Sequence, residues 1–427
     1  MTSPSRPKGT VMTACGLDFG TSNSAIGVVR DGTATLAPVE GDNTLLPSAV
    51  FFDQETKGRV LLGEAAIAAY VDHTEGRLMR ALKSILGSSL IDEETSLGGR
   101  KVPLTKVVEI FVQNLKHKAE AFAGEEITSV VMGRPVRFVD DDDTADARAQ
   151  AVLERVAREA GFRDIAFAYE PIAAAHHYEQ TVQREELVLI ADIGGGTSDF
   201  SIVRVGPGRR DRTDRSGDVL ATSGVRIGGT DLDTALSLTS VMPLLGLGTQ
   251  LVAKNLPMPN AIYHQLATWA TINFAYTYRN EREVGELQSL AAEPEKVARL
   301  LKLVHEGLGH RVAFAVEDAK IALSAEDRAA IPLAFLEAGL SALATRHEFD
   351  RAIGTATERL YKAAGGCIAA AGLKPEAIET IFLTGGSSRV PAVRTAVARA
   401  SPSARIAGGS DLLSVALGLA QMAGRAV

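Results

Sequence analysis

The chain has 427 residues, of which 46% are hydrophobic and 23% are charged, the composition of a large globular protein and not of a disordered or fibrous one. At roughly 150 residues per domain, this length predicts two or three packed units and excludes a small scaffold stapled by disulfides or metals. The net charge of −7 provides no positive field for nucleic acid or an anionic membrane, so we expect neither as a partner.

The beginning of the chain lacks the pattern of a targeting segment. Residues 1–13 contain Pro, Ser and basic residues but no apolar core, so we expect a short flexible leader. No apolar run approaches the roughly 18 residues that a membrane-spanning helix needs. Cys15 and Cys367 are far apart in the sequence, and each is expected to be a small buried side chain. Together these features predict a cytoplasmic protein.

Two hairpins with the same pattern are the strongest signal in the sequence. Each consists of a β-rich run ending in Asp, a glycine turn with Thr and Ser, and a second β-rich run, at residues 16–29 and 187–205. The first turn contains Gly20, Thr21, Ser22 and Asn23, after Asp18. The second contains Asp192, Gly194, Gly195, Gly196, Thr197, Ser198 and Asp199.

These residue types suit a phosphate group and its metal ion. Glycines let backbone N–H groups approach phosphate oxygens closely, and the Thr and Ser hydroxyls add donors. The carboxylates of Asp18, Asp192 and Asp199 can hold a hydrated Mg²⁺. One copy alone could be an ordinary glycine hairpin, but two copies with the same order favour a duplicated phosphate-binding turn. The chain contains no Walker-type loop.

The paired hairpins resemble those of the actin-like ATPase superfamily, which includes sugar kinases and the DnaK-type heat-shock chaperones. This resemblance implies an α/β fold in which duplicated ribonuclease H-like lobes face each other across a nucleotide cleft. It also implies ATP or ADP and Mg²⁺ as cofactors.

Other segments resemble the DnaK type in particular. Residues 80–87 are similar to the family's lysine segment and place its catalytic Lys on Lys83. Residues 130–138 are similar to a strand that ends in a prolyl turn, and residues 169–175 to a helix start that places the family's active-site Glu on Glu170. The resemblance therefore implies a catalytic set of Lys83, Glu170, Asp192 and Thr197.

The second half of the chain resembles the family's adenosine site. The turn with Gly228 and Gly229, the helix with Glu317 and Lys320, and residues 384–391 all match family segments. In the last of these, the cofactor-binding residues are Gly385, Gly386, Ser387 and Arg389, with Ser387 and Arg389 expected beside the base and ribose, and Asp411 matches an Asp near the cleft. Ile321 differs, because the family has there an Arg that stacks on adenine.

The resemblance divides the chain into lobes. Lobe I is expected at residues 14–188, lobe II at 189–408, and a C-terminal helix at 409–427 that returns towards lobe I. Lobe II would carry an enlarged outer subdomain at about 230–345, with an insertion at about 239–305 that contains Trp269. We interpret the insertion as packed helices in which Trp269, Tyr263, Phe274, Tyr276 and Tyr278 belong to the core, although a docking surface is an alternative.

The function implied by the resemblance is slow ATP hydrolysis by a DnaK-like, chaperone-related protein. Asp18, Asp192 and Asp199 would hold the metal mainly through water, and Lys83 and Glu170 would position the attacking water. The lobes would open and close with nucleotide state, and an unidentified protein partner or client would be expected. Because the sequence stops after its last expected helix, we expect no peptide-binding domain, as in short stand-alone DnaK-like proteins of the YegD type.

Two alternatives stay open. The first is a nucleotide sensor or adaptor that binds a protein partner and does not hydrolyse ATP. The second is a small-molecule kinase of the same superfamily, which is less favoured because only Glu170 and the metal carboxylates are available as a catalytic base.

Overall fold

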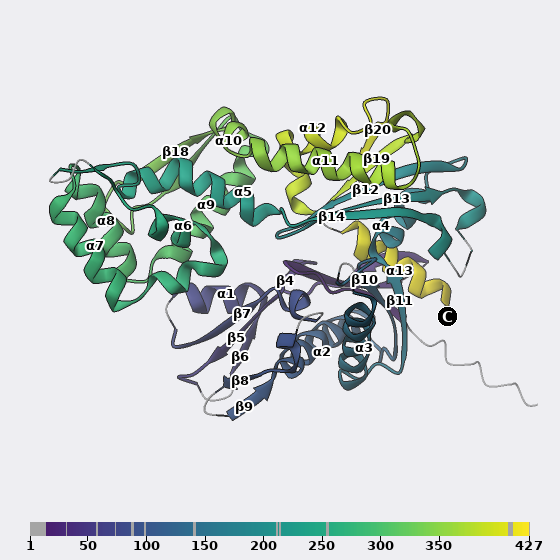
Figure 1. The fold of residues 1–427 in the computed structure, drawn as a ribbon. Helices are drawn as coiled ribbons and strands as arrows, with labels where there is room; N and C mark the ends of the chain where they lie inside the picture. The colour runs from purple at the N-terminus through teal and green to yellow at the C-terminus, as the bar shows by residue number, and fades with distance from the viewer. Residues whose placement is uncertain are drawn as a thin grey trace, which may run out of the picture. The chain divides into compact units, whose positions relative to one another are not determined.

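The computed structural model describes residues 14–426 except 31, 57–58, 73, 87–88, 98–99, 140–141, 211, 213–214, 253–255 and 409–412 (Figure 1). Helices and sheets alternate along the chain, so the predicted α/β class is confirmed. The chain divides into two compact units. The first comprises Met1–Ile190, Ser201–Thr222 and Ala407–Val427, and the second comprises Ala191–Phe200 and Ser223–Ile406.

The first unit is built on a mixed six-stranded sheet in the order β11-β10-β1-β2-β3, with β4 paired to β2. Its strands are β1 (Ala14–Asp18), β2 (Asn23–Arg30), β3 (Thr33–Leu36), β4 (Leu46–Pro47), β10 (Ser129–Arg134) and β11 (Asp164–Tyr169). β1 pairs antiparallel with β2 and parallel with β10, and Asp18 lies opposite Ala25. The first predicted hairpin is therefore confirmed, and its turn lies between Asp18 and Asn23.

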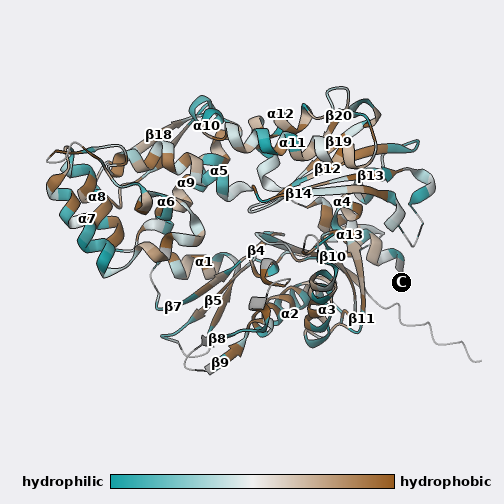
Figure 2. Cartoon of the chain, viewed as in Figure 1, coloured by the Kyte–Doolittle hydropathy of each residue, from teal (hydrophilic) through white to brown (hydrophobic). Residues whose placement is uncertain are grey.

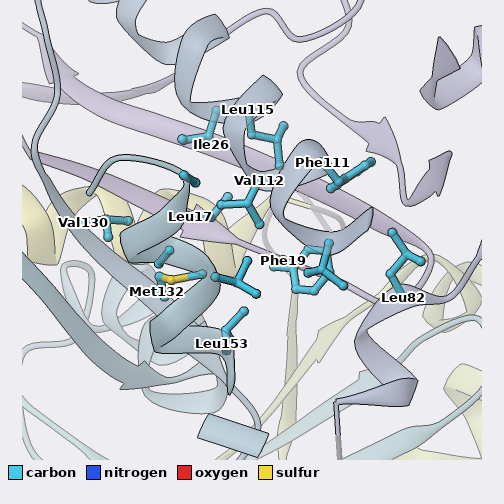
Figure 3. Packing of buried hydrophobic residues seen from close by; sticks show 14 of the residues in the cluster. Leu17, Phe19, Ile26, Leu82, Phe111, Val112, Leu115, Val130, Met132 and Leu153 are labelled. Atoms are coloured by element: carbon cyan, nitrogen blue, oxygen red, sulfur yellow. The ribbon is translucent and has the colours of Figure 1, made fainter. Parts of the chain in front are cut away.

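One face of this sheet is covered by α2 (Leu104–Ala123) and α3 (Asp143–Glu159). The stripe of buried side chains on α2 includes Phe111, Val112 and Leu115, and these pack with Leu17 and Phe19 in one apolar cluster (Figure 3). The rings of Phe19 and Phe111 lie 5.9 Å apart between centroids. Because Phe19 is buried in this core and directly precedes Gly20, the core holds one end of the first glycine turn in place.

The C-terminal helix α13 (Ser414–Ala426) packs against β1, β2 and α4 (Glu170–Glu179). It approaches the strand so closely that a Cβ atom at Gly16 would lie 2.1 Å from the backbone nitrogen of Ala420. A Cβ atom at Gly418 would likewise lie 1.9 Å from the carbonyl oxygen of Ala173. Glycine is required at both positions, because any side chain would push the helix away.

The rest of the first unit contains smaller elements. A three-stranded sheet in the order β6-β5-β7 is followed by two short 3₁₀ helices and a hairpin. These elements are β5 (Ala49–Asp53), β6 (Val60–Leu62), α1 (Gly63–Val71), β7 (Gly76–Arg80), η1 (Leu82–Ile85), η2 (Ser89–Asp92), β8 (Glu94–Leu97) and β9 (Arg100–Pro103).

A five-stranded sheet in the order β14-β13-β12-β19-β20 carries the second predicted hairpin. Its strands are β12 (Glu186–Ile193), β13 (Ser198–Val205), β14 (Val219–Val225), β19 (Thr380–Thr384) and β20 (Arg405–Gly408), with the 3₁₀ helices η3 (Pro207–Arg209) and η4 (Ser216–Asp218) before β14. The turn between β12 and β13 falls in the second unit. The second predicted hairpin is thus confirmed as a strand-turn-strand element.

Helices dominate the rest of the second unit. They include α5 (Gly229–Leu236), a π-helical turn η5 (Ser237–Val241), η6 (Met242–Leu245), α6 (Ala261–Ala267), η7 (Trp269–Ala275), α7 (Tyr278–Leu290), α8 (Pro294–His305), α9 (Gly309–Leu323), α10 (Arg346–Ala352), α11 (Gly354–Ala370), η8 (Pro375–Ala377), η9 (Gly386–Arg389) and α12 (Pro391–Ala398). The short strand pairs are β15 (Gln250–Leu251) with β16 (Leu256–Pro257) and β17 (Arg328–Pro332) with β18 (Ser341–Thr345). In Figure 2, hydrophilic and hydrophobic segments alternate along α7 and α8, as expected for helices with one buried face.

The structure corrects the interpretation of two aromatic residues in the insertion. Tyr263 is fully buried, as predicted, but Phe274 and Tyr278 are 67% and 81% exposed. The two exposed residues flank a break between η7 and α7, where Thr277 caps α7 by accepting a hydrogen bond from Asn280 N–H at 3.1 Å. Aromatic content alone does not reveal this break, so assigning both rings to the core was wrong.

Two further expectations concern the thiols and the membrane. Cys15 and Cys367 are both buried, as predicted, and no disulfide bond joins them. None of the helices in the described part of the chain combines the length and apolar character that crossing a membrane requires.

Candidate functional site

The first glycine turn is closed by two serine hydroxyl groups. Gly20 N–H donates to Ser24 Oγ at 3.1 Å, and Ser48 Oγ donates to the Gly20 carbonyl oxygen at 2.7 Å. The two hydroxyl oxygens are 2.9 Å apart, and Ser48 N–H donates to the Ser22 carbonyl oxygen at 2.8 Å. The turn is therefore rigid, and it leaves the half-buried side chains of Thr21, Ser22 and Asn23 at its surface.

Lys83 and Glu170 come together in the first unit. Lys83 Nζ donates to Glu170 Oε1, and their side chains are only 11% and 14% exposed. Lys83 lies in η1, directly after Ala81, whose φ of 56° is the only positive value among the described non-glycine residues. Glu170 is the first residue of α4. Ala81 is thus a strained residue directly before the short helix that carries Lys83, and strained residues often occur at functional sites.

Asp18 belongs to the same group of charges. Burial, together with the negative charge of Glu170, raises the pKa of Asp18 to about 7, although Lys83 opposes this effect. A carboxyl group with such a raised pKa gains strongly from a nearby cation, because the cation favours its ionised form. The structure thus brings together three residues that the sequence analysis selected separately: Asp18, Lys83 and Glu170.

The second glycine turn is held by the segment that begins α5. Gly194 N–H donates to the Thr197 carbonyl oxygen at 2.9 Å, which closes the turn. Gly229 N–H and Thr230 N–H donate to the carbonyl oxygens of Gly194 and Gly195 at 2.9 and 2.8 Å. A Cβ atom at Gly228 would lie 2.4 Å from Gly196 N, so only glycine fits there.

Residues of the C-terminal glycine motif also contact this turn. Ser387 Oγ donates to the Gly194 carbonyl oxygen at 3.0 Å. Gly385 has a φ of 80°, and a Cβ atom there would lie 2.4 Å from the Ile193 carbonyl oxygen and 2.7 Å from Asp192 Oδ1. Ser387, which is expected beside the base and ribose, therefore also supports the second glycine turn. Gly386 and Arg389 lie in η9, directly after this contact.

Lys320 is held in place by a residue that the sequence analysis did not select. Its ammonium group lies 2.8 Å from Asp233 Oδ1 and 3.5 Å from the Gly229 carbonyl oxygen. The Lys320 and Asp233 side chains are 10% and 18% exposed. The available signal was the position of Asp233, four residues after the Gly228 and Gly229 turn that resembles the family. Glu317 is half-buried on the same helix, and Asp411 lies outside the described residues.

The donor set of the second unit fits a phosphate group. A Cβ atom added at Gly196 would meet nothing within 4 Å, so the space beside this backbone is open. Thr197 Oγ1 donates to Asp199 Oδ2 at 3.1 Å, which orients the hydroxyl group at the edge of that space. Backbone N–H groups and a hydroxyl group around an open glycine turn are the usual elements of a phosphate site.

The carboxylates fit a metal ion held through water. Among the described residues, no three His, Cys, Asp or Glu side chains converge closely enough to bind a metal directly. Mg²⁺ commonly keeps several waters and uses one or two carboxylates together with phosphate oxygens. Asp192 and Asp199 flank the second turn, and Asp18 ends the strand before the first turn.

Comparison with known proteins identifies the family. The family model described as Hsp70 protein matches residues 14–109, 92–241 and 305–423. It leaves residues 242–304 unmatched, the stretch that corresponds to the expected insertion. A chaperone protein DnaK from Endomicrobium trichonymphae is 34% identical over 227 residues, which cover 52% of this chain and 34% of that protein. The match thus spans about a third of the length of this curated relative.

The family matches account for the elements described above. They include both glycine hairpins, the Lys83 and Glu170 segments, the residues on α5 and α9, and the C-terminal glycine motif. The resemblance to the DnaK-type chaperones is confirmed. The chain belongs to the Hsp70 family and has the actin-like ATPase fold of that family.

Proposed function

We propose that this chain binds ATP with Mg²⁺ and hydrolyses it slowly, as a chaperone-related ATPase. The observation that carries the proposal is the second glycine turn. Its backbone is fixed by Gly229, Thr230 and Ser387, while the space beside Gly196 stays open. Lys320, held by Asp233, adds a cation next to Gly229 for the nucleoside part of the ligand.

In this proposal each group of residues has a separate task. Backbone N–H groups of both turns, with Thr21, Ser22 and Thr197, bind the phosphates. Mg²⁺, held through water by Asp18, Asp192 and Asp199, would neutralise phosphate charge. Lys83 and Glu170 orient the attacking water, so alignment and charge neutralisation supply most of the rate enhancement.

We also propose that nucleotide state controls a protein interaction. Lobe opening after product release would change the surface offered to an unidentified partner or client. Support comes from family membership and from the name of the matched relative, a chaperone.

The test is single-turnover ATP hydrolysis by the wild type, Lys83→Ala and Thr197→Ala. We expect hydrolysis to fall by about 10²-fold or more in each variant, because each removes a group aligned on the reacting phosphate. Lys101→Ala is the matched control, since the Lys101 side chain is 82% exposed and distant in sequence from every proposed site residue. Unchanged turnover in both test variants would refute the assigned roles.

A nucleotide sensor that does not hydrolyse ATP is the second candidate. The exposed aromatic side chains of Phe274 and Tyr278 favour it, because such residues are common where proteins dock. Negligible turnover, combined with a protein interaction that depends on ATP rather than ADP, would select the sensor over the ATPase.

A further inference from the structure

The segment at residues 261–277, here called the brace segment, lies inside the stretch that the family match leaves out. It consists of α6, η7 and the two residues before α7. Both α6 and η7 contact α9, and α6 also contacts α5 (Figure 1). These are the two helices that carry Lys320 and Asp233.

The brace segment fixes the beginning of α9. Gly309, the first residue of that helix, donates its N–H to Tyr276 Oη at 2.7 Å. A Cβ atom at Gly309 would lie 2.6 Å from the same oxygen and 2.7 Å from Ile272 Cγ2. The missing side chain of Gly309 thus allows two residues of the brace segment to converge on the helix start.

Trp269 then packs along the first two turns of α9. Its ring lies 4.6 Å from the ring of His310 at an interplanar angle of 80°, and 5.2 Å from Phe314 at 71°. Both contacts are edge-to-face, the favoured geometry of aromatic pairs. His310 is only 6% exposed, so this contact is part of a packed interior and not a loose surface association.

The face of α9 that Trp269 contacts extends along the helix towards the proposed nucleoside site. His310, Phe314, Glu317 and Ile321 follow one another at spacings of four, three and four, which places them on one face of α9. Trp269 covers the first two, and Ile321 at the far end is 61% exposed. With a rise of 1.5 Å per residue, Ile321 lies about 10 Å along the helix from Phe314.

The brace segment also holds α5, through Thr234. Thr234 Oγ1 shares its one proton between the Thr230 carbonyl oxygen at 2.9 Å, within α5, and the Ala267 carbonyl oxygen at 3.1 Å. Thr234 directly follows Asp233, whose carboxylate lies 2.8 Å from Lys320 Nζ. One segment therefore contacts both helices whose side chains form this ion pair.

We propose that the brace segment is the positioning element of the nucleoside site and that Trp269 is its principal positioning residue. This inference rests on the proposed binding of ATP. By fixing α9 against α5, the segment keeps Lys320 on Asp233 beside Gly229. It also holds the aliphatic face of Ile321 where the base of a bound nucleotide packs.

The test compares two ligands with a pair of phosphate groups, of which only one also contains a nucleoside. Binding of Mg-ADP and of inorganic pyrophosphate is measured by calorimetry for the wild type, Trp269→Ala and Trp269→Phe. We expect Trp269→Ala to bind Mg-ADP about tenfold more weakly and Trp269→Phe to retain most of the affinity, since phenylalanine keeps an aromatic edge. Pyrophosphate should bind all three alike, because the hydrogen bonds described for the second glycine turn come from Gly229, Thr230 and Ser387 and not from the brace segment.

A spectroscopic measurement completes the experiment. Trp269 is the only tryptophan in the chain, so its fluorescence reports on the brace segment alone. We expect Mg-ADP to change the wild-type emission with the same dissociation constant that calorimetry gives. Tyr278→Ala is the control, since this side chain is 81% exposed and follows the brace segment directly, and it should bind Mg-ADP like the wild type.

The outcomes separate this inference from the proposed function. If the wild type binds Mg-ADP but Trp269→Ala binds it equally well, the inference is overturned and the proposed function stands. Equal weakening of Mg-ADP and pyrophosphate binding would also overturn the inference. If the wild type binds no nucleotide, the proposed function fails and the inference with it. Should Trp269→Ala not fold, Tyr276→Phe, which removes the acceptor for Gly309 N–H, takes its place with the same expectations.

Discussion

Lys83 and Glu170 are 87 positions apart in the chain, yet the ammonium group of one donates directly to the carboxylate of the other. Both side chains are largely buried, so each charge depends on the other for compensation. Glu170 is also the charged neighbour that, after burial itself, does most to raise the pKa of Asp18. The pair therefore links the proposed water-positioning residues to a proposed metal carboxylate.

Replacing Glu170 by Gln should separate binding from hydrolysis. The variant removes the negative charge that contacts Lys83, so the ammonium group attracts phosphate more strongly and ATP affinity should be equal to or higher than that of the wild type. Hydrolysis should fall by about 10²-fold, the usual effect of losing a group that aligns or deprotonates the nucleophile. Calorimetry and single-turnover kinetics measure the two effects, and a loss of ATP binding would contradict the assignment.

Replacing Asp18 by Asn should change the pH dependence of stability. The folded-state pKa of Asp18 is raised to about 7 from its ordinary value of 3.8, so protonated Asp18 favours the folded state. This contribution is fully present below the unfolded pKa and is lost as the pH rises through about 7. Without nucleotide, the wild type should therefore lose the stability contributed by Asp18 between about pH 4 and pH 7, and Asp18→Asn should lose less.

In the same variant, this gain in stability should be accompanied by weaker nucleotide binding. Since Asn carries no charge for the hydrated metal, Asp18→Asn should bind Mg-ADP more weakly at pH 8. Identical melting profiles of wild type and variant across this pH range would contradict the assigned environment of Asp18.

Gly196→Ala tests whether the second turn holds phosphate. No protein atom lies within 4 Å of the added Cβ, so the melting temperature should stay within a few degrees of the wild type. ATP affinity should nevertheless fall by at least about tenfold, because the methyl group occupies the space assigned to phosphate oxygens. Gly366→Ala, which also meets nothing within 4 Å, is the control and should bind ATP normally.

The buried ion pairs of Arg215 with Glu179 and Asp218 should contribute to stability without taking part in nucleotide binding. Arg215 Nη1 donates to Glu179 Oε2 at 2.7 Å, and Arg215 Nε donates to Asp218 Oδ2 at 2.7 Å, with all three side chains at most 6% exposed. Arg215→Ala should lower the free energy of unfolding by about 3–5 kcal/mol, because it removes the cation that pairs with two buried carboxylates at once. Arg158→Ala, in a half-exposed pair with Glu154, should cost less than about 1 kcal/mol in denaturant titrations.

This network also predicts acid sensitivity. Burial alone would raise the pKa of Glu179, but hydrogen bonds from His176, Arg215 and Gly206 N–H outweigh it and hold the pKa below its usual range. A lowered carboxylate pKa contributes stability above the unfolded value of 4.5, and this is lost as the pH falls through the folded value. Stability that falls equally with acid in the wild type and Glu179→Gln would refute this role.

Much of the fold and the site could be predicted because glycine turns have a strong chemical signature. The order of Asp, Gly, Thr and Ser identified both hairpins, and both exist. Lys83 and Glu170 were selected from motif context alone, and the structure places them in contact. Asp233 was not assigned a role, because its task depends on the distance to a lysine in α9 and not on its own segment.

The insertion contains features that sequence patterns do not predict. Phe274 and Tyr278 were assigned to the core because aromatic residues usually lie there, but the break before α7 turns them to solvent. The contacts of Trp269 with His310 and Phe314 join residues about 40 positions apart, with no local pattern to predict them. The hydrogen bond of Ser387 to the second glycine turn is likewise a contact that the C-terminal motif alone does not predict.

The close approach of Gly16 to the backbone of Ala420 has a consequence for folding during synthesis on the ribosome. β1 is synthesised about 400 residues before α13, the helix that covers one face of it. At 5–20 residues per second, on the order of tens of seconds separate their emergence. During that interval an apolar sheet surface stays open on the nascent chain, so a member of a chaperone family itself offers a binding site to the cell's folding machinery.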